Sequence, residues 1–293
     1  MRIYALASAA ILVSSVALAE PSGKLMLYTS QPNADAQQTI DAFMAKHPGV
    51  EVEFFRDGTT KVMAKLESEF AAGNPQPDLL LIADTVTMEG LEGADRLLAY
   101  PGADVSAYYA QLMDPEGHYF STKLITTGIV YNTGAPMEPT SYKDLLDPDA
   151  SGKIAIPSPL TSGAATITMA TLTEDPNLGW DYYVALAEQQ TLAQGGNGGV
   201  YRAVSGGEKL YGFVVDFLAI RNKADGAPID FVFPKEGVSF VTEPVAILKT
   251  AQNPEAAKAF VDFLLSPEGQ QLAASQGYLP AHPDVTPPAG FPP

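Results

Sequence analysis

Short apolar stretches alternate with amphipathic ones over the first third of the chain, and this alternation predicts strands and helices in turn. Residues 24–28, 50–55 and 79–82 are strand-like, and the third is apolar throughout, as expected of a strand buried on both faces. Residues 36–47, after the first strand, and residues 61–72, after the second, carry apolar side chains at helical spacing. This order predicts a parallel sheet with right-handed crossovers.

Polar residues follow each of these strands at the point where the strand ends. Ligands of parallel sheets bind beyond the carboxyl ends of the strands, where helix N-termini point. The loops at that edge therefore contribute four candidate ligand-binding residues: Thr29, Ser30, Thr59 and Asp84. Each of them could instead cap the helix that follows it, which is the commoner use of such residues.

Two long extended stretches, 119–132 and 240–248, interrupt the helices of the rest of the chain. The first is expected as two extended pieces, and both stretches are interpreted as crossings between two lobes. Small-molecule sites favour such interfaces between domains, so the ligand cleft is expected there. The predicted organisation is a first lobe of 20–125 and 247–293, a second lobe of 130–240, and hinge crossings at 126–129 and 241–246.

The most informative local site lies in the second lobe, where small residues precede a predicted helix. Ser162, Gly163 and Ala164 would let an anion approach backbone N–H groups closely, and the helix dipole would favour its negative charge. An ordinary helix cap explains the same residues.

Three further candidates rest on their positions in the predicted elements. Thr127 lies between the two extended pieces of 119–132. Asp216 closes the strand at 210–215, where a carboxylate could hold an amine or hydroxyls or could form a turn. Glu236 lies in a Pro/Gly turn and could equally be a solvated residue.

The N-terminal residues have the layout of a secretory signal peptide. Arg2 precedes an apolar run, and Ala17-Leu18-Ala19 is a small-x-small cleavage site. We expect cleavage after Ala19 and a soluble periplasmic protein without membrane insertion. An uncleaved membrane anchor is the alternative, although the apolar run is short for a membrane span.

Composition excludes several classes of function. The formal net charge is −17, so nucleic acid and anionic lipid are poor partners. The chain has no cysteine, which excludes thiol catalysis and thiolate metal sites. The three histidines are far apart, and no metalloprotease, nucleophile-elbow or P-loop motif is present. No catalytic residue, metal site or cofactor is therefore predicted, although a secreted serine hydrolase built on Ser162 stays open as an alternative.

Nearly the whole chain after the signal peptide resembles the solute-binding proteins of ABC importers. It is similar to the branch that contains ferric-iron, thiamine, hexose-phosphate and aminoethylphosphonate binders. The resemblance is carried by residues 27–30, 77–84, 127–132, 226–237 and 253–270. It implies an α/β, two-lobed type II periplasmic binding fold, delivery of a solute to a membrane permease, a monomer and no catalysis. A sensor partner that docks on a membrane receptor when loaded is a further alternative.

The resemblance also bears on the ligand. Iron binders of this branch carry adjacent tyrosines where this chain has Phe217 and Leu218, neither of which can supply a phenolate. The branch commonly places an anion at the helix start that matches residues 162–164. We therefore predict a small organic anion, such as a phosphonate or a phosphorylated compound, held by backbone dipoles and hydroxyls because the loops show no basic residue.

Two other ligands stay open within the same class of protein. A polyamine or another cation would be held by Asp84, Asp216 and Glu236. Ferric iron is the second alternative, although the tyrosines that bind it in the family are missing.

Overall fold

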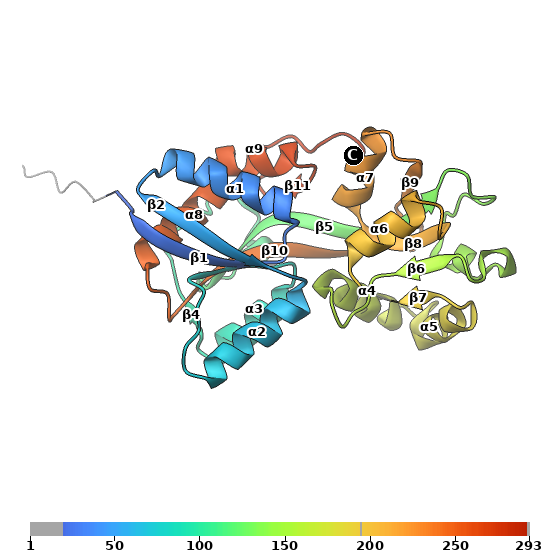
Figure 1. The fold of residues 1–293 in the computed structure, drawn as a ribbon, viewed down its shortest axis with the longest axis horizontal. Helices are drawn as coiled ribbons and strands as arrows, with labels where there is room; N and C mark the ends of the chain where they lie inside the picture. Colours follow the sequence, from blue (N-terminus) through green and yellow to red (C-terminus); the bar gives the residue numbers. More distant parts are fainter. Residues whose placement is uncertain (1–19, 194, 292–293) are drawn as a thin grey trace, which may run out of the picture.

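A single mixed β-sheet runs along the molecule in the computed structural model, which describes residues 20–193 and 195–291 (Figure 1). The predicted signal peptide and its cleavage site lie outside the described residues. The strands follow one another in space in the order β2 (Val50–Arg56), β1 (Gly23–Thr29), β3 (Leu79–Leu81), β10 (Ser239–Leu248), β5 (Tyr119–Asn132), β8 (Tyr211–Val215), β6 (Ile154–Ile156) and β7 (Leu192–Ala193).

The first part of the sheet is parallel, as the sequence predicts. β1 pairs with β2 on one side and β3 on the other, both in the parallel sense. Successive residues of β1 point to opposite faces, so Leu27 and Tyr28 belong to two separate cores. The helices that pack on one face are α1 (Asn33–Lys46) and α8 (Pro254–Leu265), and those on the other are α2 (Thr59–Ala71) and α3 (Thr85–Gly93).

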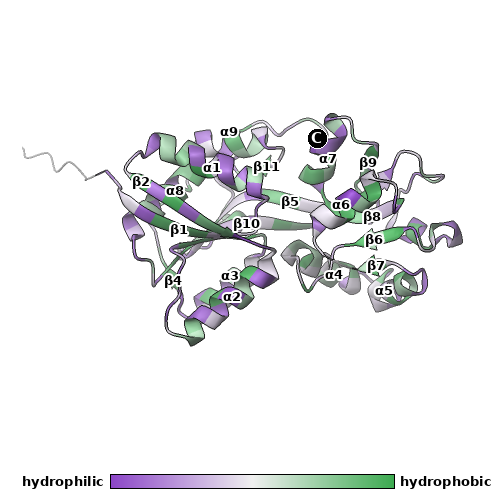
Figure 2. Ribbon diagram, in the orientation of Figure 1, coloured by the Kyte–Doolittle hydropathy of each residue, from purple (hydrophilic) through white to green (hydrophobic). Residues whose placement is uncertain are grey.

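The second part of the sheet is covered on both faces in the same way. Phe213 of β8 packs with residues of α4 (Gly163–Glu174), α5 (Gly179–Glu188) and the short 3-10 helix η2 (Tyr142–Leu146). Val214, the next residue, packs on the other face with α6 (Asn197–Ser205) and α7 (Asp216–Ala224). Figure 2 shows apolar residues along β6 and β10 and many polar residues on α1 and α2.

Two long strands join these parts. β5 and β10 are antiparallel partners from Ser239 opposite Thr127 to Ala246 opposite Tyr119. β10 also pairs with β3 of the first part, and β5 also pairs with β8 of the second part. The β5–β10 pair therefore joins the two parts into one sheet. The expectation of two extended pieces at 119–132 is wrong, because β5 is one continuous strand. The lobe and hinge boundaries given above stay a prediction.

The remaining elements extend this frame. They are β4 (Leu97–Leu98), η1 (Ala110–Leu112), η3 (Pro148–Ala150), β9 (Ile229–Val232), α9 (Pro267–Ser275) and β11 (Leu279–Pro280). The turn expected at Asp216 and Phe217 is wrong, because both residues belong to α7. Its apolar residues 217–220 form one continuous run directly after the apolar strand, so they gave no helical repeat in the sequence.

One buried carboxylate connects three distant segments of the first part, and it generates a stability prediction. Asp78 accepts hydrogen bonds from the backbone N–H groups of Met26 (2.7 Å), Gln252 (2.6 Å) and Asn253 (3.0 Å). Asp78→Ala leaves these donors without their acceptor, and we expect the free energy of unfolding to fall by about 2–4 kcal/mol. Urea denaturation followed by circular dichroism measures the change.

Asp41→Ala is the matched control. Asp41 is exposed and accepts one hydrogen bond, from Gln37 on the same helix. Its removal should change the free energy of unfolding by less than about 0.5 kcal/mol. Equal effects of the two substitutions would contradict the role assigned to Asp78.

Candidate functional site

A cavity of about 480 Å³ lies between the two parts of the sheet, and the first residues of four helices meet at its wall. Asn33 begins α1, Thr59 begins α2 and Asn197 begins α6. Ser162 is the N-cap of α4, and Ala164 lies in its first turn. The first N–H groups of a helix lack partners within it and carry partial positive charge, so four such ends favour an anion.

The loops of the two parts touch each other beside this cavity. A Cβ atom on Gly58 would overlap the carbonyl oxygen of Thr161, which lies just before α4. A Cβ atom on Gly163 would lie 2.6 Å from the carbonyl oxygen of Ala83. Both positions therefore need glycine, since the start of α4 presses against the loops that follow β2 and β3.

Four of the predicted ligand residues line the cavity: Ser30, Thr59, Ser162 and Ala164. The Ser30 hydroxyl accepts a hydrogen bond from the Ala83 N–H at 3.0 Å. The Ser162 hydroxyl accepts from the Ala165 N–H (3.3 Å) and from the Asn197 side chain (3.2 Å). The serines thus also support the loops, and contact with a ligand stays a prediction for all four.

Three other predicted residues are buried and do not line the cavity. The Thr29 hydroxyl donates to the Leu81 carbonyl at 2.8 Å and accepts from the Gln31 N–H at 3.0 Å. Gly163 contacts the opposite loop as described above. Thr127 is buried in β5, and its carbonyl accepts a hydrogen bond from the Tyr142 hydroxyl at 3.2 Å.

The three predicted carboxylates form hydrogen bonds within the protein. Asp84 caps α3 by accepting from the N–H and the hydroxyl of Thr87. Glu236 accepts from the Ser141 hydroxyl and from the Tyr142 N–H. Asp216 is fully buried and accepts from both the N–H (2.8 Å) and the hydroxyl (2.6 Å) of Thr126. All three lie outside the cavity wall.

Basic side chains line the cavity, contrary to the expectation from the loops. Arg56, Lys61 and Arg202 contribute three cationic groups, against the two carboxylates of Asp57 and Glu243. The Arg56 guanidinium donates to the backbone carbonyls of Gln31 (2.6 Å) and Ser30 (3.1 Å), the two residues that follow Thr29. The wall therefore has an excess of positive charge within a protein whose net charge is −17.

The position of these cations explains why they were missed. Arg56 ends β2 and Lys61 lies in the first turn of α2, so both are next to the predicted loops. Arg202 was missed because it lies within a helix and not in one of the predicted loops. The glycine-rich residues 195–199, expected to form a flexible turn, line the cavity together with Arg202, and α6 begins among them at Asn197 rather than at Val200.

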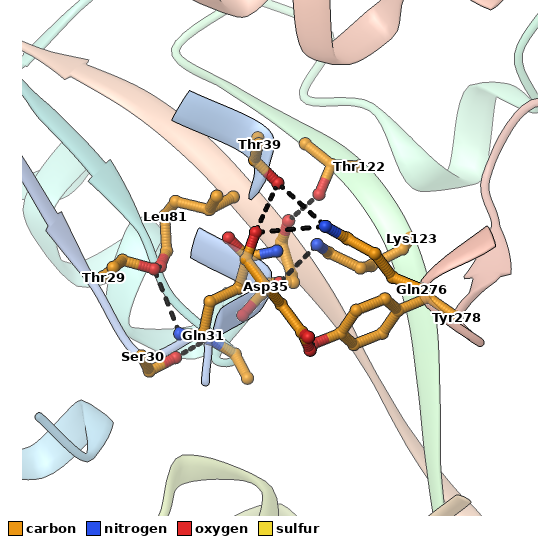
Figure 3. Close-up of polar contacts among 12 residues, drawn as sticks. Thr29, Ser30, Gln31, Asp35, Thr39, Leu81, Thr122, Lys123, Gln276 and Tyr278 are labelled. Carbon is orange, nitrogen blue, oxygen red and sulfur yellow. Dashed lines mark hydrogen bonds and ion pairs between the residues drawn. The ribbon is translucent and has the colours of Figure 1, made fainter. Parts of the chain in front are cut away.

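The floor of the cavity comes from β10 and the segment before β11. Glu243 and Tyr278 line it, and Glu243 forms an ion pair with Lys123 of β5 at 2.8 Å. Figure 3 shows the polar cluster around Lys123, Tyr278 and Asp35. Burial raises the pKa of the Glu243 carboxyl, and the neighbouring Lys123 opposes that rise. These residues are far apart in the sequence, so no local motif joined them.

The comparisons with known proteins agree with this architecture. The family model of the bacterial extracellular solute-binding proteins matches residues 25–279. An uncharacterized protein of Haemophilus influenzae is 31% identical over 289 residues, which cover 92% of this chain and 82% of that protein.

Solved structures show the fold. The periplasmic binding protein AfuA from Actinobacillus pleuropneumoniae, with fructose 6-phosphate bound, is 26% identical with a TM-score of 0.82, covering 91% of this chain and 87% of that one. Iron-bound HitA from Pseudomonas aeruginosa is 22% identical with a TM-score of 0.78, covering 92% and 90%. These are type II periplasmic binding proteins, so the predicted fold class is confirmed. Across the described ranges, no helix combines the length and apolar character of a membrane span.

The buried Asp216 carboxyl predicts a pH dependence of stability. Burial, opposed by the hydrogen bonds from Thr126 and Phe217, raises its pKa from 3.8 to about 6. A carboxyl whose pKa is higher in the folded state favours folding when it is protonated, so this contribution is present at low pH and lost as pH rises through 6. Relative to Asp216→Asn, the unmodified protein should gain about 1 kcal/mol of unfolding free energy between pH 7 and pH 5.

Urea denaturation of both proteins at each pH measures this difference. Asp216→Asn keeps the size of the side chain and removes the titration, so other groups cancel in the comparison. Parallel pH profiles for the two proteins would contradict the assignment to Asp216.

Proposed function

This chain belongs to the bacterial extracellular solute-binding proteins, in the branch that includes iron and hexose-phosphate binders, and we propose that its solute is a small organic anion. The chain is the solute-binding component of an ABC importer. A phosphate ester or a phosphonate is the proposed solute, captured in the periplasm and delivered to the permease.

The observation that carries this proposal is the convergence of four helix N-termini with three cationic side chains on one cavity. Backbone N–H groups at helix starts are well suited to a phosphate group. Arg202 adds a guanidinium, which can bind phosphate oxygens in a bidentate manner. The volume of about 480 Å³ suits a small molecule rather than a macromolecule. AfuA, which resembles this chain, holds a sugar phosphate.

The observations favour an anion over the alternatives within the same class. A polyamine was expected to be held by Asp84, Asp216 and Glu236, and all three are engaged in hydrogen bonds away from the cavity wall. On the wall itself, the three cationic side chains outnumber the two carboxylates of Asp57 and Glu243. Ferric iron would need phenolates. The Tyr278 hydroxyl donates to Asp35, and burial raises the pKa of this phenol well above its ordinary value.

A serine hydrolase built on Ser162 gains no support. Within residues 20–193 and 195–291, the Ser162 hydroxyl has Ala165 and Asn197 as hydrogen-bond partners rather than a histidine. His118 lies beside Glu92 and Asp114, and His282 packs against the Tyr108 ring. Members of the family are transport proteins. A protein that docks on a membrane receptor when loaded would bind its solute in the same cavity, so the cavity does not separate this alternative from import.

A thermal-shift screen tests the class of solute. The panel comprises sugar phosphates, phosphonates, polyamines, thiamine and ferric salts. A solute at one hundred times its dissociation constant should stabilise the protein by about 2.7 kcal/mol, which raises the melting temperature. Shifts with polyamines or ferric salts, and none with any phosphate ester or phosphonate, would contradict the proposal.

The tightest phosphate ester of that screen then tests the cationic wall. Arg202→Ala should raise its dissociation constant roughly 10- to 100-fold, because a charge-assisted hydrogen bond is lost. Isothermal titration calorimetry measures the constant. Lys235→Ala is the control, since Lys235 is exposed in the turn between β9 and β10 and lies off the cavity wall. Equal affinities of the two variants would contradict a contact between Arg202 and the solute.

A further inference from the structure

A second group of ionisable side chains lies in the first part of the sheet, off the wall of the cavity. Glu92 comes from the last turn of α3, and Asp114, Glu116 and His118 come from the turn that precedes β5. The ligand atoms of Glu92, Glu116 and His118 lie within 4.8 Å of one another. The helix and the turn are distant in the sequence, so no local motif joined these residues.

Hydrogen bonds of the turn hold these side chains in place. The Asp114 carboxylate accepts from the His118 N–H at 2.7 Å, and the Asp114 carbonyl accepts from the Gly117 N–H at 3.1 Å. The Gly117 carbonyl accepts from the Tyr100 N–H at 2.8 Å, which fixes the turn to the segment after β4. The side chains of Asp114, His118 and Glu92 are 5%, 18% and 23% exposed, so the group is partly shielded from water.

One nitrogen of this group is buried without a hydrogen bond. The His118 Nδ1 atom has no hydrogen-bond partner in the part of the chain that the structure describes. Glu92 Oε1 lies 3.1 Å from it and Asp114 Oδ2 lies 3.3 Å from it, but neither oxygen is aligned with the direction of a ring N–H. Buried polar atoms without a partner are rare in folded proteins, so this nitrogen calls for a further group.

The same distances fit ligands that share one metal ion. A tetrahedral zinc ion binds imidazole nitrogen and carboxylate oxygen at about 2.0–2.1 Å, which separates neighbouring ligand atoms by roughly 3.3–3.4 Å. The separations of 3.1 and 3.3 Å from His118 Nδ1 are close to that value. Glu116 is exposed, so its carboxylate can rotate towards the other ligands, and an ion can enter past it from solvent.

The charge of the group also favours a cation. The carboxylates of Glu92 and Asp114 have His118 as their ion-pair partner. Within residues 20–193 and 195–291, no lysine or arginine pairs with either of them or with Glu116. Burial raises the pKa of the Glu92 carboxyl, and the neighbouring Asp114 raises it further. A divalent cation would neutralise this excess of negative charge, whereas one proton on the imidazole would offset only part of it.

We propose that Glu92, Glu116 and His118 form a metal site that binds Zn²⁺, with Asp114 holding His118 in position. An imidazole nitrogen combined with carboxylate oxygens is a ligand set that suits zinc, whereas calcium and magnesium prefer sites made of oxygen alone. A bound ion would tie the end of α3 to the turn before β5. It would therefore stabilise the first part of the sheet without contacting the solute, so this inference does not depend on the nature of the solute.

Calorimetric titration with zinc chloride tests this site on the unmodified protein, after treatment with EDTA and dialysis into a buffer free of phosphate and chelator. We expect one zinc ion per chain and a higher melting temperature when zinc is present. Calcium and magnesium should bind at least about 10-fold more weakly than zinc. Absence of zinc binding, or binding of calcium as tight as that of zinc, would overturn the proposal.

Variants assign the zinc ion to these residues. His118→Ala and Glu92→Gln each remove one ligand. Each should weaken zinc binding by at least about 10-fold, because the loss of an outer-shell partner alone costs roughly 10- to 100-fold in metal affinity. Glu51→Gln is the matched control, since Glu51 is exposed on β2, and it should keep the affinity of the unmodified protein. Zinc affinity that is unchanged in both ligand variants would show that the ion binds elsewhere and would overturn the site.

Glu116→Gln keeps the test decisive if the two more buried substitutions prevent folding. Glu116 is exposed, so its substitution should leave the circular dichroism spectrum unchanged. It removes the third ligand and should also weaken zinc binding by at least about 10-fold. A folded Glu116→Gln protein that binds zinc as tightly as Glu51→Gln would contradict the proposed ligand set.

Discussion

The antiparallel pairing of β5 with β10 is the constraint on which the rest of the structure depends. The pairing runs from Ser239 opposite Thr127 to Ala246 opposite Tyr119, across the junction of the two parts of the sheet. Each part of the sheet, with the helices that pack on it, is joined to the other through these two strands. The helix starts of both parts therefore line one cavity. The ion pair between Lys123 and Glu243 lies within this same pairing, so the floor of the cavity is also the junction of the two parts.

The first part of the fold could be predicted because its signals are local. Each apolar strand is followed by polar loop residues and an amphipathic helix, and such a pattern needs no distant partner to be interpreted. The same locality gave Ser30, Thr59, Ser162 and Ala164, which all lie at strand-to-helix turns and all line the cavity. The carboxylate of Asp84 was harder to assign, because capping and ligand binding place the same residue at the same turn.

The rest of the site depends on contacts between distant segments. Each of the two long strands carries a single charged residue, Lys123 in β5 and Glu243 in β10, and a lone charge within a strand was a signal. It becomes a prediction only when the two strands are known to pair, because each charge then finds its partner. Arg202 was missed because it lies within α6 and not in one of the loops from which ligand residues were predicted.

The charge of the whole protein and the charge of its cavity have opposite signs and different effects. The net charge of −17 keeps the surface well solvated and repels other polyanions. Under the proposed function, the helix starts, Arg56 and Arg202 would act at short range on an anion that has already left bulk water. A solute that reaches Ser30 and Ser162 together would contact both parts of the sheet at once, so it would bind best when their loops touch, as Gly58 and Thr161 do. Under the proposed function, affinity and closure then have the same physical origin.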